Sequence, residues 1–125
     1  LISGILFTGK SKLLIDEVLD GKITLILSTQ LIHEFKRVIA RDKFKLSREQ
    51  QNALTNFILS IGSIVRVRSN FRVVKEDPND DIVLRTAYDG RVDYIVSGDE
   101  HLLTLNEFRR IKIFTISKMQ ELIGG

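Results

Sequence analysis

The chain contains no cysteine, and its 125 residues include a single proline. Without cysteine the protein forms no disulfide and no thiolate metal site, so any metal must be held by oxygen or nitrogen ligands, and the chain suits a reducing interior. No apolar run is long enough to span a bilayer, and no secretory signal is visible at the start. These absences predict a cytoplasmic protein without a membrane partner.

The composition is that of a globular protein. Hydrophobic residues make up 43% of the chain and charged residues 28%, without a low-complexity tract. This length predicts one domain with a real core. A formal charge of +3 and a pI near 9.3 favour a polyanionic partner only mildly.

Apolar segments typical of strands alternate with segments of helical periodicity, which predicts parallel strands joined by right-handed crossovers in an α/β fold. The expected strands are Ile23–Leu27, Ile64–Arg68, Asp93–Val96 and Ile111–Phe114. The expected helices are Ser11–Asp20 with Gly21 as its stop, one capped by Ser28 or Thr29, one boxed by Ser47 and Gln50 and ending at Gly62, one opening at Asp80–Asp81 and ending at Gly90, and one boxed by Ser117 and Gln120.

Carboxylates recur where this topology places the carboxyl edge of the sheet. Asp80 and Asp81 open a helix, Asp99 directly follows a strand, and Glu34 lies beside the apolar stripe of the helix after another strand. Helices that follow parallel strands begin at this edge, which is also where ligands bind. Gathered carboxylates repel one another unless a hard cation such as Mg²⁺ or Mn²⁺ neutralises them.

Each acid also has a purely structural interpretation. Asp80 and Asp81 suit a helix cap and its macrodipole, Asp99 suits a turn, and Glu34 suits a solvated helix flank. Their coincidence on one edge favours the metal site.

Three segments together, LISGIL, LSTQLIHEF and DPNDDIVLRTAYDGRVDYIVSGDEHLL, resemble the PIN domain (PilT N-terminus), in particular the prokaryotic branch of toxins from toxin–antitoxin pairs. The resemblance implies a three-layer α/β/α sandwich with a mainly parallel sheet and cleavage of RNA with Mg²⁺ or Mn²⁺. It implies metal-binding, catalytic roles for Glu34, Asp81 and Asp99, with Asp80 and Ser97 as auxiliary residues. It also implies a homodimer and an antitoxin partner.

The sequence departs from the family at its beginning. The family's central first strand ends in an aspartate directly before a segment like LISGIL, and this chain begins at Leu1 without that strand. We therefore expect a single PIN-like domain over residues 1–125 that is truncated at its N-terminus and lacks the central strand, with the missing aspartate encoded upstream.

Basic residues gather after the Glu34 helix. They are predicted to contact RNA phosphates, although a charged run of this kind is usually a solvated face. The group consists of Lys36, Arg37, Arg41, Lys43, Lys45 and Arg48.

Two alternatives compete with the nuclease interpretation. A PIN-like fold lacking one ligand would serve as an inactive module that binds RNA or protein. Residues 4–11 also match the GxxxxGK[ST] pattern of a nucleotide-binding loop, with Lys10 as its lysine, but the bulky apolar interior of the match argues against that function.

Overall fold

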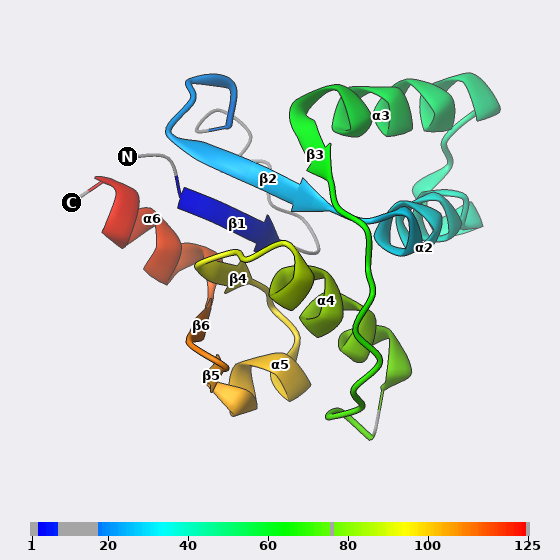
Figure 1. Ribbon diagram of the computed structural model, residues 1–125. Helices are drawn as coiled ribbons and strands as arrows, with labels where there is room; N and C mark the ends of the chain where they lie inside the picture. The colour runs from blue at the N-terminus through cyan, green and yellow to red at the C-terminus, as the bar shows by residue number, and fades with distance from the viewer. Residues whose placement is uncertain (1–2, 8–17, 76, 125) are drawn as a thin grey trace.

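A six-stranded sheet in the order β3-β2-β1-β4-β6-β5 forms the centre of the molecule (Figure 1). The computed structural model describes residues 3–7, 18–75 and 77–124, with the backbone alone for residues 3–7 and 43. The strands are β1 (Ser3–Phe7), β2 (Ile23–Leu27), β3 (Gly62–Ile64), β4 (Tyr94–Val96), β5 (Glu107–Phe108) and β6 (Ile111–Phe114). The helices are α2 (Thr29–Ile39), α3 (Arg48–Ile61), α4 (Pro78–Asp89), α5 (Glu100–Leu105) and α6 (Ile116–Gly124), with a 3₁₀ turn η1 (Asp42–Phe44).

The sheet is parallel except for β5, which pairs antiparallel with β6. Alternating side chains of β2 show that helices cover both faces. Ile26 packs in the cluster that holds the buried side of α4, whereas Leu25 and Leu27 pack with Ile32 of α2. Ile23 joins Met119 of α6 on the latter face. The predicted α/β class with a mainly parallel sheet is confirmed.

The expectation that the central strand is absent is wrong for this structure. The backbone of β1 lies between β2 and β4, with Ile5 opposite both Leu25 and Tyr94. The physical reason is that the inner edges of β2 and β4 carry backbone N–H and C=O groups that must be paired. The apolar segment Ser3–Phe7 supplies those partners.

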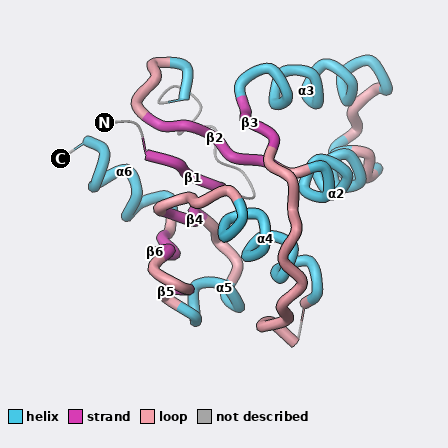
Figure 2. Tube along the Cα trace, in the orientation of Figure 1, coloured by secondary structure: helices cyan, strands magenta, loops and turns pink. Residues whose placement is uncertain are grey.

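The predicted strand Ile64–Arg68 is also misplaced, because β3 ends at Ile64. Its partner β2 ends at Leu27, whose carbonyl oxygen accepts a last bond from the Val65 N–H at 2.8 Å. Beyond that point the chain has no strand to pair with. It continues as a long segment along α4, drawn in pink in Figure 2.

Contacts to α4 hold this segment in place. The Asp89 carboxylate accepts bonds from the Arg68 and Ser69 N–H groups and from the Ser69 hydroxyl, at 2.7–2.9 Å. Burial alone raises the pKa of Asp89, but these donors outweigh it and lower the pKa below its ordinary value. Arg85 Nε donates to the Phe71 carbonyl oxygen at 2.8 Å.

The helix caps were partly predicted. Ser28 caps α2, and Ser47 and Gln50 form the expected capping box of α3. Asp77, not Asp80 or Asp81, caps α4, because Pro78 occupies the first helical position, where its missing N–H costs nothing.

At the C-terminal end the expected Ser117 box is wrong. Thr115 Oγ1 accepts from the Lys118 N–H at 3.2 Å, so α6 begins two residues earlier than predicted. The short elements α5 and β5 were not predicted.

The first predicted helix is described only at its end. Its residues 11–17 lie outside the described ranges, Val18 and Leu19 are helical, and Gly21 adopts the expected left-handed conformation with φ +77°.

Candidate metal centre

Three carboxylates meet at the carboxyl edge of the sheet. Asp77 and Asp80 come from the start of α4 and Asp99 from the start of α5, and one oxygen from each lies within 4.8 Å of the others. Asp77 and Asp80 are three residues apart and therefore project from the same side of the first turn. Asp99 reaches them because it directly follows the turn after β4.

Asp80 is the most unusual member of this acidic group. Only 5% of the residue is exposed, and its buried Oδ2 has no hydrogen-bond partner among the residues that the structure describes. Burial and then the negative charges of Asp99 and Asp77 raise the pKa of Asp80 to about 7, against 3.8 for an ordinary aspartate. A buried carboxylate oxygen without a donor is costly unless a cation satisfies it.

Hydrogen bonds fix the orientation of Asp99. Its Oδ1 accepts from the His101 N–H at 2.8 Å and from the Leu102 N–H at 3.4 Å. Its own N–H donates to Ser97 Oγ at 3.0 Å, and Ser97 is buried. Ser97 therefore shapes the turn that presents Asp99.

Glu34 lies across from the acidic group. It lines one cleft of about 560 Å³ together with Asp77, Asp80 and Asp99, but it comes from α2 and is not one of the three gathered carboxylates. Its Oε2 pairs with Arg37 at 2.6 Å, and the Glu34 side chain is 29% exposed. An exposed pair of this kind contributes little stability, so Glu34 is available to a ligand in the cleft.

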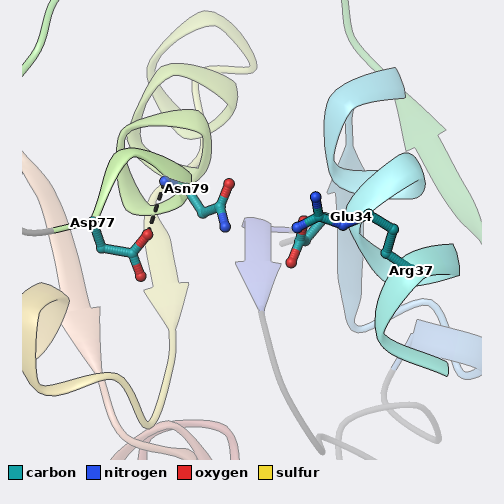
Figure 3. A network of polar contacts seen from close by, with 4 residues as sticks. All are labelled: Glu34, Arg37, Asp77 and Asn79. Carbon is teal, nitrogen blue, oxygen red and sulfur yellow. Dashed lines mark hydrogen bonds and ion pairs between the residues drawn. The ribbon is translucent and has the colours of Figure 1, made fainter. Parts of the chain in front are cut away.

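Figure 3 shows α2 and the first turn of α4 facing each other across this region. The Asn79 side chain points from α4 toward the Glu34 side, and Asn79 also lines the cleft. The inner walls are apolar, with Leu31 and Phe35 from α2 and Ile82 from α4. The acids therefore line a cleft whose other walls are largely apolar.

Asp81 faces a different side of α4. Its Oδ1 accepts from the N–H groups of Val73 and Val74 at 2.8 and 2.9 Å, and it lines a separate hollow. Successive helix residues are rotated by about 100°, so Asp80 and Asp81 cannot both face the cleft. The structure thus replaces the expected grouping of Glu34, Asp81 and Asp99 by one that contains Asp80, with Asp81 bound to backbone amides.

One buried bond joins the two helices that carry these acids. Ser28, which caps α2, and Thr86 of α4 are both fully buried, and their hydroxyl oxygens lie 2.8 Å apart. This bond ties the end of β2 to α4, which helps to set the distance between Glu34 and the acidic group.

The two histidines of the chain, His33 and His101, are exposed. The predicted basic cluster is also exposed at Lys36, Arg37, Arg41, Lys45 and Arg48, while the Lys43 side chain lies outside the described part of the chain.

The nucleotide-binding loop finds no support in the described part of its motif. Residues 4–7 lie in β1, which pairs with β2 on one side and β4 on the other, so they do not form a loop. Residues 8–11, including Lys10, lie outside the described ranges.

The acidic group fits a divalent metal. Its donors are carboxylate oxygens, which Mg²⁺ and Mn²⁺ prefer, and Asp80, whose Oδ2 has no partner among the described residues, lies close to like charges that a cation would neutralise. Asp77 was missed in the sequence, although an aspartate directly before a proline at a helix start signals a cap. Asp80 also carried a signal, because it shares the helical stripe of the buried residues Val83, Leu84 and Ala87.

A comparison with protein-family models matches the PIN domain over residues 1–101. This match covers most of the chain, so the chain belongs to the PIN-domain family. PIN domains are generally nucleases and typically use divalent metals. Comparisons with curated proteins and with solved structures gave no match. Among the described helices, none is both long and apolar enough to cross a membrane.

Proposed function

We propose that this chain is a divalent-metal-dependent ribonuclease that hydrolyses RNA phosphodiester bonds. The observation that carries the proposal is the acidic group at the carboxyl edge of the sheet, to which Asp80 contributes a buried carboxylate with one oxygen unpartnered among the described residues. Family membership supports nuclease chemistry, and the carboxylate donor set supports Mg²⁺ or Mn²⁺.

The residues divide the work between them. Asp77, Asp80 and Asp99 would hold the metal, and Glu34 would approach it from the opposite wall of the cleft. A bound divalent ion supplies an activated water and stabilises charge on the phosphate and the leaving oxygen. Ser97 keeps the Asp99 turn in place through its bond to the Asp99 N–H. Hydrolysis of this kind needs no covalent protein intermediate, which suits a chain without cysteine.

The resemblance extends the proposal to the biological partners. We propose that the ribonuclease is the cytoplasmic toxin of a toxin–antitoxin pair, that it acts as a homodimer, and that an antitoxin blocks its cleft. The basic residues around η1 would hold RNA phosphates beside the cleft.

The test is metal binding and cleavage by two matched variants. Asp80→Asn removes one charge from the acidic group, whereas Asp20→Asn removes one from an exposed position before β2, at the opposite edge of the sheet. We expect wild type and Asp20→Asn to gain thermal stability in Mn²⁺ and to cleave labelled single-stranded RNA, and Asp80→Asn to do neither. Cleavage by Asp80→Asn at the wild-type rate would reject the proposed site.

One observation favours a second candidate, an inactive module that binds RNA. Residues 1–10, which include β1, contain no aspartate or glutamate, and the resemblance places the family's first aspartate directly before a segment like LISGIL. The upstream aspartate expected from the resemblance stays a prediction. RNA binding and Mn²⁺ binding without any cleavage would favour this candidate over the enzyme.

A further inference from the structure

A second hollow, of about 510 Å³, lies on the other side of α4 from the acidic cleft. Its walls are the segment before α4 and one side of that helix. Three of the lining residues are cations, namely Arg72, Lys75 and Arg85, and one is the carboxylate Asp81. The remaining lining residues are Val74, Pro78 and Ile82. Cations therefore outnumber carboxylates in this basic hollow, whereas the neighbouring cleft is acidic.

Within the described part of the chain, the cations of this basic hollow form no ion pair with a neighbouring carboxylate. Arg72 and Lys75 are exposed, and among the described residues neither these two nor Arg85 forms an ion pair. Glu76, next to Lys75 in the sequence, lies outside the described residues. The one lining carboxylate, Asp81, already accepts two backbone N–H bonds through Oδ1. Positive charge thus remains available for an anionic ligand.

Arg85 is held in place before any ligand arrives. It is half-buried, and its Nε donates to the Phe71 carbonyl oxygen at 2.8 Å, which fixes the plane of the guanidinium. A guanidinium whose rotation is restricted loses less entropy when it binds a phosphate than a free side chain does. The start of α4 at Pro78 adds the positive end of a twelve-residue helix dipole to the same wall.

The basic hollow adjoins the acidic cleft across a single helix turn. Ile82 lines both of them, and Asp80 and Asp81 are neighbours in the sequence that face the two sides. A nucleic acid strand with one phosphate at the acidic group would pass directly over this turn toward Arg72, Lys75 and Arg85.

We propose that the basic hollow is a phosphate-binding subsite for single-stranded RNA. It holds the strand on the opposite side of α4 from the phosphodiester bond that is cut. This inference rests on the proposed ribonuclease function. It adds a binding site distinct from the basic residues around η1, on the opposite side of the acidic cleft. The ligand class is the phosphodiester backbone, because cations without a base-reading pocket recognise charge and not sequence.

The experiment compares two double charge reversals of equal net charge. Arg72→Glu/Lys75→Glu alters the basic hollow at exposed side chains, and Arg110→Glu/Lys112→Glu alters exposed side chains at the β5–β6 hairpin. Binding of a fluorescent single-stranded RNA is measured by anisotropy in EDTA over a range of salt concentrations. EDTA prevents cleavage and makes the measurement independent of metal. Thermal unfolding with and without Mn²⁺ is recorded for each variant.

We expect the hollow variant to bind RNA about tenfold more weakly near 0.1 M salt, and its salt slope to fall by about 1.4, since each lost phosphate contact on a single strand removes about 0.7. The hairpin variant should stay within about twofold of wild type. Equal losses in both variants, or none in the hollow variant, would overturn the subsite.

Two further outcomes separate this inference from the ribonuclease proposal. An unchanged RNA affinity in the hollow variant, together with a retained Mn²⁺ stabilisation, overturns the subsite alone. A selective loss of RNA affinity supports the subsite even if wild type shows no Mn²⁺ stabilisation. Polyglutamate is tested as a competitor at the same concentration of negative charge as the RNA. If it competes as well as RNA does and loses affinity equally in the hollow variant, the hollow binds an acidic protein instead, and the RNA assignment is overturned.

Discussion

Asp80 and Asp81 are identical neighbours with opposite surroundings, and replacing each by asparagine tests the proposed centre. Asp80 is buried among like charges with an oxygen that has no donor, whereas Asp81 accepts two backbone N–H bonds. The two substitutions change the same atoms and the same charge. Their effects on stability should nevertheless have opposite signs, and only Asp80→Asn should abolish metal binding.

The magnitude for Asp80 follows from its pKa. A change from 3.8 unfolded to about 7 folded means that the protein prefers this carboxyl protonated. The associated stability is fully present below pH 3.8 and is lost as the pH rises through about 7. The full pKa difference corresponds to about 4 kcal/mol of folding free energy, and about 2 kcal/mol of it should remain once the neighbouring acids adjust. Without metal at pH 8, Asp80→Asn should therefore raise the melting temperature by about 5–10 °C, with the gain vanishing near pH 4.

The magnitude for Asp81 follows from its hydrogen bonds. A bond to a charged acceptor contributes about 1.5–3 kcal/mol and a neutral one about 1 kcal/mol. Because asparagine can still accept from Val73 and Val74, Asp81→Asn should lower the free energy of unfolding by about 1–2 kcal/mol. Its response to Mn²⁺ should stay close to that of wild type.

The assay is thermal unfolding at pH 8 in EDTA and again in Mn²⁺ at about one hundred times its Kd, where a single bound ion stabilises the fold by about 2.7 kcal/mol. Wild type and Asp81→Asn should gain this stability, and Asp80→Asn should not. If Asp81→Asn loses the Mn²⁺ response while Asp80→Asn keeps it, the assignment of the two residues is reversed and the reasoning from burial fails.

Three further predictions concern the frame around the site. Asp89→Ala should cost about 2 kcal/mol of folding free energy at pH 7, because it removes the acceptor of three hydrogen bonds. The lowered pKa of Asp89 contributes its full stability to the fold only above about pH 3.8. Urea unfolding should therefore show the loss shrinking below that pH. Thr86→Val should cost about 1–3 kcal/mol in chemical denaturation, because the buried Ser28 hydroxyl would keep only its bond to the Leu31 N–H, and a free energy of unfolding equal to that of wild type would contradict this reason. Gly62→Ala should cost about 1–3 kcal/mol because its methyl group would collide with the Leu27 side chain, and a melting temperature equal to wild type would contradict the close approach of β3 to β2.

Several features of the fold follow from local patterns that can be recognised in the sequence. Ser28, Ser47 with Gln50 and Gly21 each act within a few residues of their own position, so the boundaries they mark were predictable. The alternation of strands and helices also fixed the parallel class, because only a crossover helix joins parallel neighbours of this spacing.

Long-range pairing decided what local patterns left open. The strand after α3 stops at Ile64 because β2 offers no partner past Leu27, and no property of the residues at 65–68 shows this. The segment Ser3–Phe7 became the central strand because two neighbouring edges needed hydrogen-bond partners.

The candidate site divides in the same way. The sequence alone determined that acids gather at the carboxyl edge of a parallel sheet, since the order of strands and helices places Asp80 and Asp99 there. Only the tertiary structure decided which acids share a space. The rotation of α4 about its axis directs Asp80 into the cleft and Asp81 toward the backbone of residues 73 and 74, and that rotation is set by packing against β1 and β2.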